Sequence, residues 1–282
     1  MNARIVGGDA HAAGTHQRGA THHVRQEIGV PGRFIALEGP DGVGKTSLAR
    51  CLAEMTYEAA VEAAAHGLRS GIGPAGGRPL VFVPKRQISG TSAYAAKLMN
   101  QLATMLWHSG DAPDLPDSFW VGLQAAWFTA HAETVLQPLL SAGYDVIVDG
   151  WLYKFWSKRL IQGYTQHDVD VIFARVPMPD TVVLLTADIG SLFDRRQQFR
   201  PAELGMHAGY STLDRQSFVD YQQAGLGLLR SFAQQHQWPV VDLDLERSAE
   251  DTAARIAPLI AALRTTAPRP LPAFAADGRP AS

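Results

Sequence analysis

Residues 34–47 read FIALEGPDGVGKTS, a short apolar run followed by a glycine-rich turn. FIAL is too short for a stable helix and predicts a buried strand, whereas an amphipathic helical pattern follows the turn. Between them, GPDGVGKT from Gly39 to Thr46 matches G-x-x-x-x-G-K-[ST], in which backbone N–H groups cradle phosphates, the lysine reaches their oxygens and the hydroxyl ligates Mg²⁺. This order predicts a phosphate-binding loop; the alternative is a glycine-rich turn without a ligand. The predicted nucleotide contacts are Gly39, Asp41, Gly42, Val43, Gly44, Lys45, Thr46 and Ser47.

The chain beyond this loop alternates short β-branched runs with longer helical patterns, which is typical of an α/β fold with right-handed crossovers. We expect a five-stranded parallel sheet with helices on both faces. Ligands of such sheets bind at the carboxyl ends of the strands. The expected strands are 34–37, 80–83, 146–148, 182–185 and 240–243, and the expected helices are 45–66, 91–108, 119–142, 152–163, 189–198, 215–236 and 248–264.

Asp149 directly follows the third expected strand, in the segment DVIVDGW. An acid at this place in a phosphate-binding fold holds the magnesium ion or its waters, together with the loop hydroxyl. We therefore predict that Thr46 and Asp149 share a metal. The alternative is that Asp149 only caps the next helix.

The segment DRRQQFR at 194–200 carries Arg195, Arg196 and Arg200 in one short stretch. Arg196 and Arg200 are one helical turn apart, so the three could close over a transferring phosphoryl group and neutralise its developing charge. We interpret the segment as a catalytic lid. The alternative is a basic surface that only faces water.

The composition restricts the partners and the compartment. A formal net charge of −2 gives no global positive field, so neither a nucleic acid nor a membrane is an expected partner. Cys51 is the only cysteine, and its helical spacing with Leu48 and Leu52 predicts a small core residue. No apolar run approaches the roughly 18 residues of a membrane helix, and we expect a cytoplasmic protein.

The two ends of the chain differ from the rest in composition. Residues 1–31 are rich in Gly, Ala, His and Thr, and residues 265–282 are rich in Pro and Ala, with no sustained period in either. We expect a disordered N-terminal extension and a flexible C-terminal tail around one folded domain at 32–264.

Four segments, in order, make the chain resemble the thymidylate kinase family. They are EGPDGVGKTSLAR at 38–50, KRQISGT at 85–91, the stretch from LQAAWFTAH to DVIVDGW at 123–151, and DRRQQFRPAEL at 194–204. The resemblance implies a P-loop kinase that moves the ATP γ-phosphate to a nucleoside monophosphate in nucleotide biosynthesis, with Mg²⁺ and a homodimer. It also implies that Arg86 contacts the acceptor phosphate and that Asp41 lies near the acceptor sugar.

The chain departs from the family at the acceptor. Where the family has Asp-Arg-Tyr, this sequence has Asp149, Gly150 and Trp151, so Lys154 or Arg159 is the candidate replacement for the arginine. A gapless alignment puts Gln124 and Phe128 where the family has an aromatic residue and a thymine-reading arginine. A shift of one turn would instead offer Trp120 or Trp127 to the base. The predicted acceptor contacts are Asp41, Arg86, Phe128, Trp151 and Lys154.

We therefore expect a kinase acting on dTMP or a related monophosphate, with Lys45, Asp149, Arg195, Arg196 and Arg200 as the catalytic residues. Two alternatives stay open: a kinase of a nucleoside or modified nucleotide in a specialised pathway, and an inactive nucleotide-binding regulatory protein. No NKxD-type segment that would read guanine is present, which argues against a GTPase.

Overall fold

The strands form a parallel sheet in the order β2-β3-β4-β1-β5-β6. This computed structural model describes residues 31–66, 77–90, 92–107 and 115–265. The predicted N-terminal extension and C-terminal tail lie outside these ranges, apart from Pro31 and Thr265 at their inner ends. The strands are β1 (Phe34–Glu38), β2 (Met55–Thr56), β3 (Leu80–Val83), β4 (Asp145–Val148), β5 (Thr181–Thr186) and β6 (Val240–Asp242).

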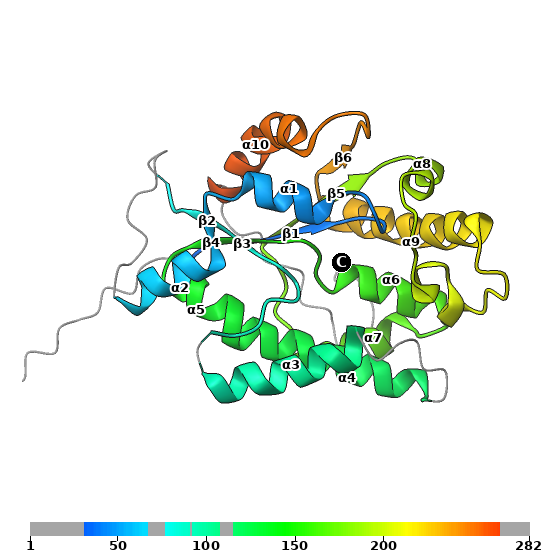
Figure 1. Cartoon of the computed structure of the whole chain (residues 1–282), viewed down its shortest axis with the longest axis horizontal. Helices are drawn as coiled ribbons and strands as arrows, with labels where there is room; N and C mark the ends of the chain where they lie inside the picture. Colours follow the sequence, from blue (N-terminus) through cyan, green and yellow to red (C-terminus); the bar gives the residue numbers. More distant parts are fainter. Residues whose placement is uncertain (1–30, 67–76, 91, 108–114, 266–282) are drawn as a thin grey trace, which may run out of the picture.

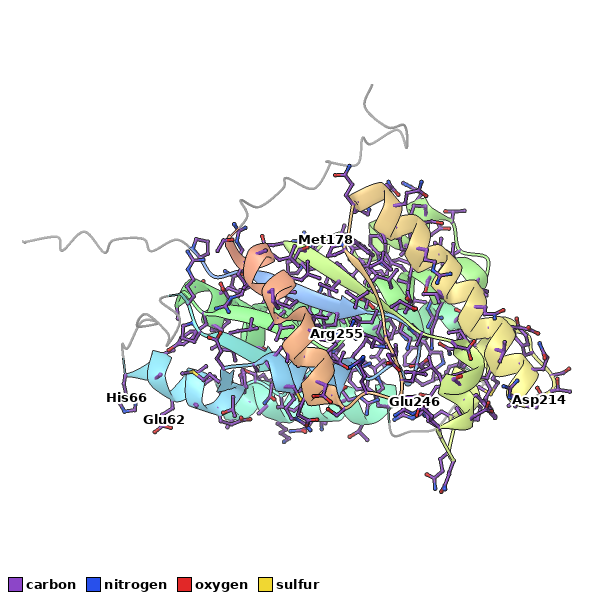
Figure 2. All side chains as sticks on the ribbon, turned by 90° about the horizontal axis from the view of Figure 1, so that it is seen from above. Glu62, His66, Met178, Asp214, Glu246 and Arg255 are labelled. Atoms are coloured by element: carbon purple, nitrogen blue, oxygen red, sulfur yellow. The ribbon has the colours of Figure 1, made fainter. Side chains whose placement is uncertain are left out.

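Helices connect these strands and cover both faces of the sheet. Figure 1 shows α1 and α10 together on one side of the strands, and α3, α4 and α5 on the other. In the view of Figure 2, α10 crosses over the sheet at Arg255, and Asp214 caps the start of α9. The helices are α1 (Lys45–Leu52), α2 (Tyr57–Ala65), α3 (Ala93–Trp107), α4 (Asp117–His131), η1 (Ala132–Leu136), α5 (Gln137–Ser141), α6 (Tyr153–Ile161), α7 (Gln166–Ile172), α8 (Ile189–Asp194), η2 (Pro201–Glu203), η3 (Met206–Ala208), α9 (Arg215–His236) and α10 (Ala249–Thr265).

The predicted fold class is confirmed, with six strands in place of five. The helix expected at 45–66 is interrupted because Ala53 turns to an extended conformation. Met55 and Thr56 then pair with β3, and the Thr56 side chain accepts the Ala59 N–H to start α2. A two-residue strand inside a helical pattern carries no periodic signal of its own.

Other expectations differ from the structure in detail, and the helix expected at 189–198 ends at Asp194. The helix expected at 119–142 is a run of three helices, in which η1 is a π-helical turn just before Pro138, a residue with no N–H to donate. Cys51 is exposed and lies 3.8 Å from a Glu250 carboxylate oxygen, so its prediction as a core residue is wrong. Its side chain lies on the solvent side of α1, next to α10.

The central strands are buried along their whole length, as a parallel sheet covered on both faces requires. β1 is paired with β4 on one side and with β5 on the other, with Ala36 opposite Val148. The carboxyl ends of β1 and β4 therefore place the loop after Glu38 beside Asp149. Among the described residues, no helix has the length and apolarity needed to cross a lipid bilayer.

Candidate active site

The glycine-rich loop leads directly into α1, and Lys45 is the first residue of that helix. Gly44 precedes it with φ 94°, a left-handed conformation that side chains disfavour. The buried Lys45 Nζ donates hydrogen bonds to the carbonyl oxygens of Gly39 (2.8 Å) and Pro40 (2.7 Å). Burial, followed by repulsion from Lys154, lowers the pKa of Lys45 well below its usual value. The ammonium is thus fixed at the loop, where an added anion would relieve both effects.

Thr46 and Asp149 meet where the carboxyl ends of β1 and β4 lie side by side. The Thr46 hydroxyl donates to Asp149 Oδ2 at 2.5 Å, and the backbone N–H of Lys85 donates to Asp149 Oδ1 at 2.8 Å. A hydroxyl and a carboxylate are hard oxygen ligands of the kind that Mg²⁺ binds while keeping several waters. Within the described part of the chain, no cluster of three or more His, Cys, Asp or Glu residues offers a fuller metal cage.

Asp41, in the middle of the loop, is held from two helices. It pairs with Lys154 of α6 and lies 3.6 Å from Lys158 of the same helix. Gln222 of α9 donates to its carboxylate (3.1 Å) and accepts its backbone N–H (3.0 Å). Burial alone raises the pKa of Asp41, but the two ammonium groups outweigh it and hold the pKa well below its usual range. Asp41 is therefore a fixed carboxylate between the loop and the neighbouring cavity.

A cavity of about 220 Å³ opens beside the loop. Asp41 and Lys154 form its border with the phosphate-binding loop, and residues from α3, α4, α6, the lid segment and α9 complete it. It is rich in cations, as expected of a site for an anionic ligand. Its cations are Lys85, Arg86, Lys154, Lys158, Arg159 and Arg200, and its carboxylates are Asp41, Asp117 and Glu203.

The end of the cavity nearer α4 combines aromatic and amide groups. Trp120 and Phe155 line it, together with Gln124 and Gln162. Arg159 is 7% exposed and donates to Gln162 Oε1 (2.6 Å) and Gln124 Oε1 (3.4 Å). Such a mixture of flat apolar surface and hydrogen-bonding groups suits a heterocyclic base.

The three arginines of the predicted lid have separate positions. Arg196 lies against the phosphate-binding loop, because a Cβ placed on Gly42 would be 3.1 Å from Arg196 Cδ. It pairs with Glu203 (3.0 Å) and packs over the Phe199 ring. Arg200 lines the cavity. Arg195 is exposed and donates to the Leu245 carbonyl (2.5 Å), so its predicted catalytic role does not fit its placement.

Arg86 lines the cavity, with its guanidinium 4.9 Å from the centre of the Trp107 ring. Partial burial lowers its pKa, and so does the nearby Arg200 guanidinium. The two like charges thus approach the same space from different segments. The position of Arg86 in the cavity is compatible with its predicted role at the acceptor phosphate.

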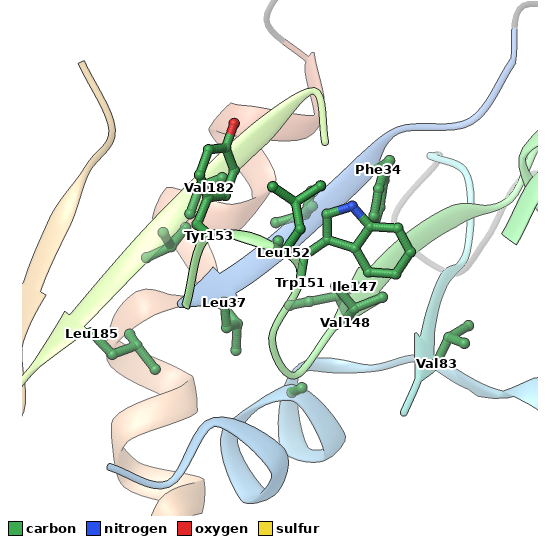
Figure 3. Close-up of a cluster of buried hydrophobic side chains, with 14 of the residues drawn as sticks. Phe34, Leu37, Val83, Ile147, Val148, Trp151, Leu152, Tyr153, Val182 and Leu185 are labelled. Carbon is green, nitrogen blue, oxygen red and sulfur yellow. The ribbon is translucent and has the colours of Figure 1, made fainter. Parts of the chain in front are cut away.

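Phe128 and Trp151 do not line the cavity, which corrects their prediction as acceptor contacts. Each is 1% exposed, and their rings meet edge to face at 4.9 Å. Figure 3 shows Trp151 beside Phe34 in the hydrophobic core. Trp127 is also fully buried, whereas Trp120 of the same helix lines the cavity. The face of α4 that carries Phe128 packs into the hydrophobic core. The gapless alignment had instead predicted that Phe128 faces the acceptor.

Glu38 ends β1 under the loop as a fully buried carboxyl group. Its Oε1 accepts the Trp151 N–H at 2.9 Å, and Oε2 has no hydrogen-bond partner among the residues described. Burial raises its pKa from 4.5 to about 7, although Lys45 and other lysines oppose this shift. The folded protein therefore binds a proton here more tightly than the unfolded chain does.

Replacement of Glu38 by Gln is expected to flatten the pH dependence of stability. In the wild type, the stabilising contribution of a raised carboxyl pKa is complete below pH 4.5 and is lost as the pH rises through 7. Relative to Glu38→Gln, the wild type should lose on the order of 3 kcal/mol of unfolding free energy across that interval. Urea unfolding at several pH values measures this, with exposed Glu133→Gln as the control. Parallel profiles for the wild type and Glu38→Gln would contradict the buried-acid interpretation.

Sequence reasoning missed several residues of the site. Lys85 follows β3 and was not singled out, although the rule that ligands bind at the carboxyl ends of strands applies to it. Gln222, Tyr221 and His207 approach from distant segments with no local motif. His131 does not line the cavity: it is fully buried with Nε2 3.2 Å from the Pro84 carbonyl, and burial lowers its pKa to about 4.

Comparison with known proteins supports the fold. No family model matches the sequence, and no curated protein matches it. Among solved structures, the chain is similar to thymidylate kinase from Ehrlichia chaffeensis, with 15% sequence identity and a TM-score of 0.50. The match covers 82% of this chain and 100% of that one. The chain thus has an α/β, P-loop kinase-like fold with a parallel sheet and helices on both faces.

Proposed function

We propose that this protein transfers the γ-phosphoryl group of ATP to a nucleoside monophosphate, dTMP or a close relative. The observation that carries the proposal is the contact between two sites of different character. The phosphate-binding loop with Lys45 and Thr46 adjoins a cation-rich cavity, and Asp41 and Lys154 form their shared border. A donor triphosphate in the loop and an acceptor phosphate in the cavity would meet at this border.

In the proposed reaction, an oxygen of the acceptor phosphate attacks the γ-phosphorus. The bond from the γ-phosphorus to the β,γ-bridging oxygen breaks, and ADP leaves with that electron pair. Lys45 and the loop amides would hold the donor, Arg196 would reach the transferring group from the lid, and Arg86 with Arg200 would hold the acceptor phosphate. Thr46 and Asp149 fit Mg²⁺, which when bound would neutralise charge on the β- and γ-oxygens.

The cation distribution favours a monophosphate acceptor over a nucleoside. Arg86, Arg200 and Lys154 all line the cavity, and a 5′-phosphate would lie among them. A nucleoside kinase has no acceptor phosphate to neutralise, so such a cluster would be costly there. The inactive regulatory protein is the second alternative, and only turnover distinguishes it.

A panel of acceptors tests the proposal. The protein is incubated with Mg-ATP and each acceptor in turn, and ADP formation is measured; the acceptors are dTMP, dUMP, dCMP, dGMP, UMP and thymidine. We expect monophosphates to exceed thymidine in kcat/KM by about 100-fold, because charge-assisted contacts contribute roughly 1.5–3 kcal/mol each. dTMP and dUMP differ by one methyl group, worth about 0.8 kcal/mol, so we expect a preference of less than about tenfold. Turnover of thymidine alone would show that the protein is a nucleoside kinase. ATP binding without turnover of any acceptor would favour the inactive regulatory protein.

A further inference from the structure

Lys85 lies where the donor loop and the acceptor cavity meet. It directly follows Pro84 at the end of β3, and its backbone N–H is held by Asp149. Its side chain lines the cavity together with Lys154 and Arg86. The segment is further fixed from α4, because Trp127 donates its indole N–H to the Lys85 carbonyl at 3.1 Å. The main chain of Lys85 is thus anchored on both sides, and the ammonium extends from a rigid base.

Gly150 provides the space that the Lys85 side chain uses. A Cβ placed on Gly150 would lie 3.8 Å from Lys85 Cδ, 3.9 Å from Lys85 Nζ and 3.9 Å from Lys45 Cε. The φ of Gly150 is 129°, a conformation that other residues rarely adopt. Any long side chain at this position would compete with both lysines. Gly150 therefore leaves room for two ammonium-bearing chains, one from the loop and one from β3.

The Lys85 ammonium has no ion pair or hydrogen bond among the described residues, although carboxylates lie nearby. Asp41 is engaged by Lys154, Lys158 and Gln222, and Asp149 by Thr46 and the Lys85 main chain. Burial lowers the pKa of Lys85, and the neighbouring Lys154 lowers it further. Lys85 is thus a partly buried cation that faces the cavity without a fixed partner, and an anion in the cavity would stabilise it.

We propose that Lys85 binds the acceptor phosphate at the border with the donor loop, and so supplies the cation that Gly150 does not. This inference rests on the proposed function and adds a phosphate-binding residue to it. Lys85 would hold the attacking oxygen next to the phosphoryl group that Lys45 holds. A lysine suits this place because its flexible stem and point charge can follow a phosphate that changes position during transfer.

A purely structural role for Lys85 and a role in phosphate binding make different predictions, and the contacts of Lys85 favour the second. The contacts that fix the local fold, to Asp149 and Trp127, use only the main chain of Lys85. Replacement of the side chain should therefore leave folding unchanged. It should also affect a ligand with a phosphate more than the same ligand without one.

The test compares dTMP with thymidine by titration calorimetry in wild type, Lys85→Met and Lys85→Arg, with exposed Lys97→Met of α3 as the matched control. We expect Lys85→Met to weaken dTMP binding by about 10- to 100-fold, as loss of one charge-assisted contact does, and to leave thymidine binding within about twofold. Lys85→Arg keeps a cation and should retain most of the difference. Equal weakening of dTMP and thymidine, or no weakening of dTMP, would overturn the proposal.

Failure of the proposed function is recognised separately. If the wild type bound none of the nucleoside monophosphates, that function would be wrong, and inorganic phosphate titrated into the ADP-bound protein would become the probe. Weaker phosphate binding by Lys85→Met than by Lys97→Met would still support an anion site at Lys85. Equal phosphate binding by the two variants would refute it.

Discussion

Lys45→Met is expected to lower acceptor-dependent ADP formation by about 10³-fold or more. The Lys45 ammonium is buried at the mouth of the loop, bonded to the Gly39 and Pro40 carbonyls. Negative charge grows on the bridging and γ-oxygens during transfer, and a fixed cation there stabilises the transition state more than the bound substrate. Methionine keeps most of the apolar stem of the side chain and removes the charge together with its hydrogen-bond donors.

The folded state should tolerate this substitution. Burial already disfavours the charged form of Lys45, so loss of the charge removes a desolvation cost together with two hydrogen bonds. Thermal unfolding of the wild type and Lys45→Met should differ by only a few degrees. A folded Lys45→Met protein with wild-type turnover would refute the assignment of the donor site.

Arg196→Ala is expected to reduce kcat by about 100-fold and to change the KM for ATP far less. Arg196 lies against Gly42 of the loop, and its Nη1 is buried without a hydrogen-bond partner in the described part of the chain. Removal of one preorganised hydrogen-bond donor that stabilises a transition state typically lowers kcat by about 10²- to 10³-fold. Arg200→Ala should instead raise the KM for the acceptor, because Arg200 lines the cavity.

Arg195→Ala is the matched control for the lid, because the adjacent arginine is turned toward Leu245 and away from the site. It should retain turnover within about threefold, as surface substitutions usually do. Steady-state kinetics with ATP and dTMP varied in turn separate the effect on kcat from the effect on each KM. Equal losses for Arg195→Ala and Arg196→Ala would mean that the segment acts only through its fold or its total charge.

Most of the fold could be predicted because its strands and long helices carry strong local signals. The five expected strands are present within a residue or two, and α9 has the predicted bounds. The two-residue β2 was missed because its apolar spacing continues that of α1. Helix α7 was missed although Thr165 and Asp168 form a capping box, a signal that the sequence contains.

The site could be predicted where one segment carries it and not where distant segments converge. The loop is a local motif, and Thr46 with Asp149 follows from the positions of two strand ends. Which way Arg195 and Phe128 face depends on the exact rotation of a helix or turn, which neighbouring packing decides. Gln222 reaches Asp41 from 181 positions further along the chain, a separation over which a single sequence gives no register.

Gln222 also links the phosphate-binding loop to the lid segment. Its one amide group holds Asp41 of the loop and the Glu203 carbonyl of the lid at the same time, the latter at 3.0 Å. If the segment at Glu203 moved away from α9, the bond from Gln222 to the Glu203 carbonyl would break. A neutral hydrogen bond of this kind contributes only about 0.5–1.5 kcal/mol net. In the proposed reaction, release of ADP and the phosphorylated product would break the Gln222 bond to Glu203 without unfolding α9, and the bond from the same amide to Asp41 would stay in place.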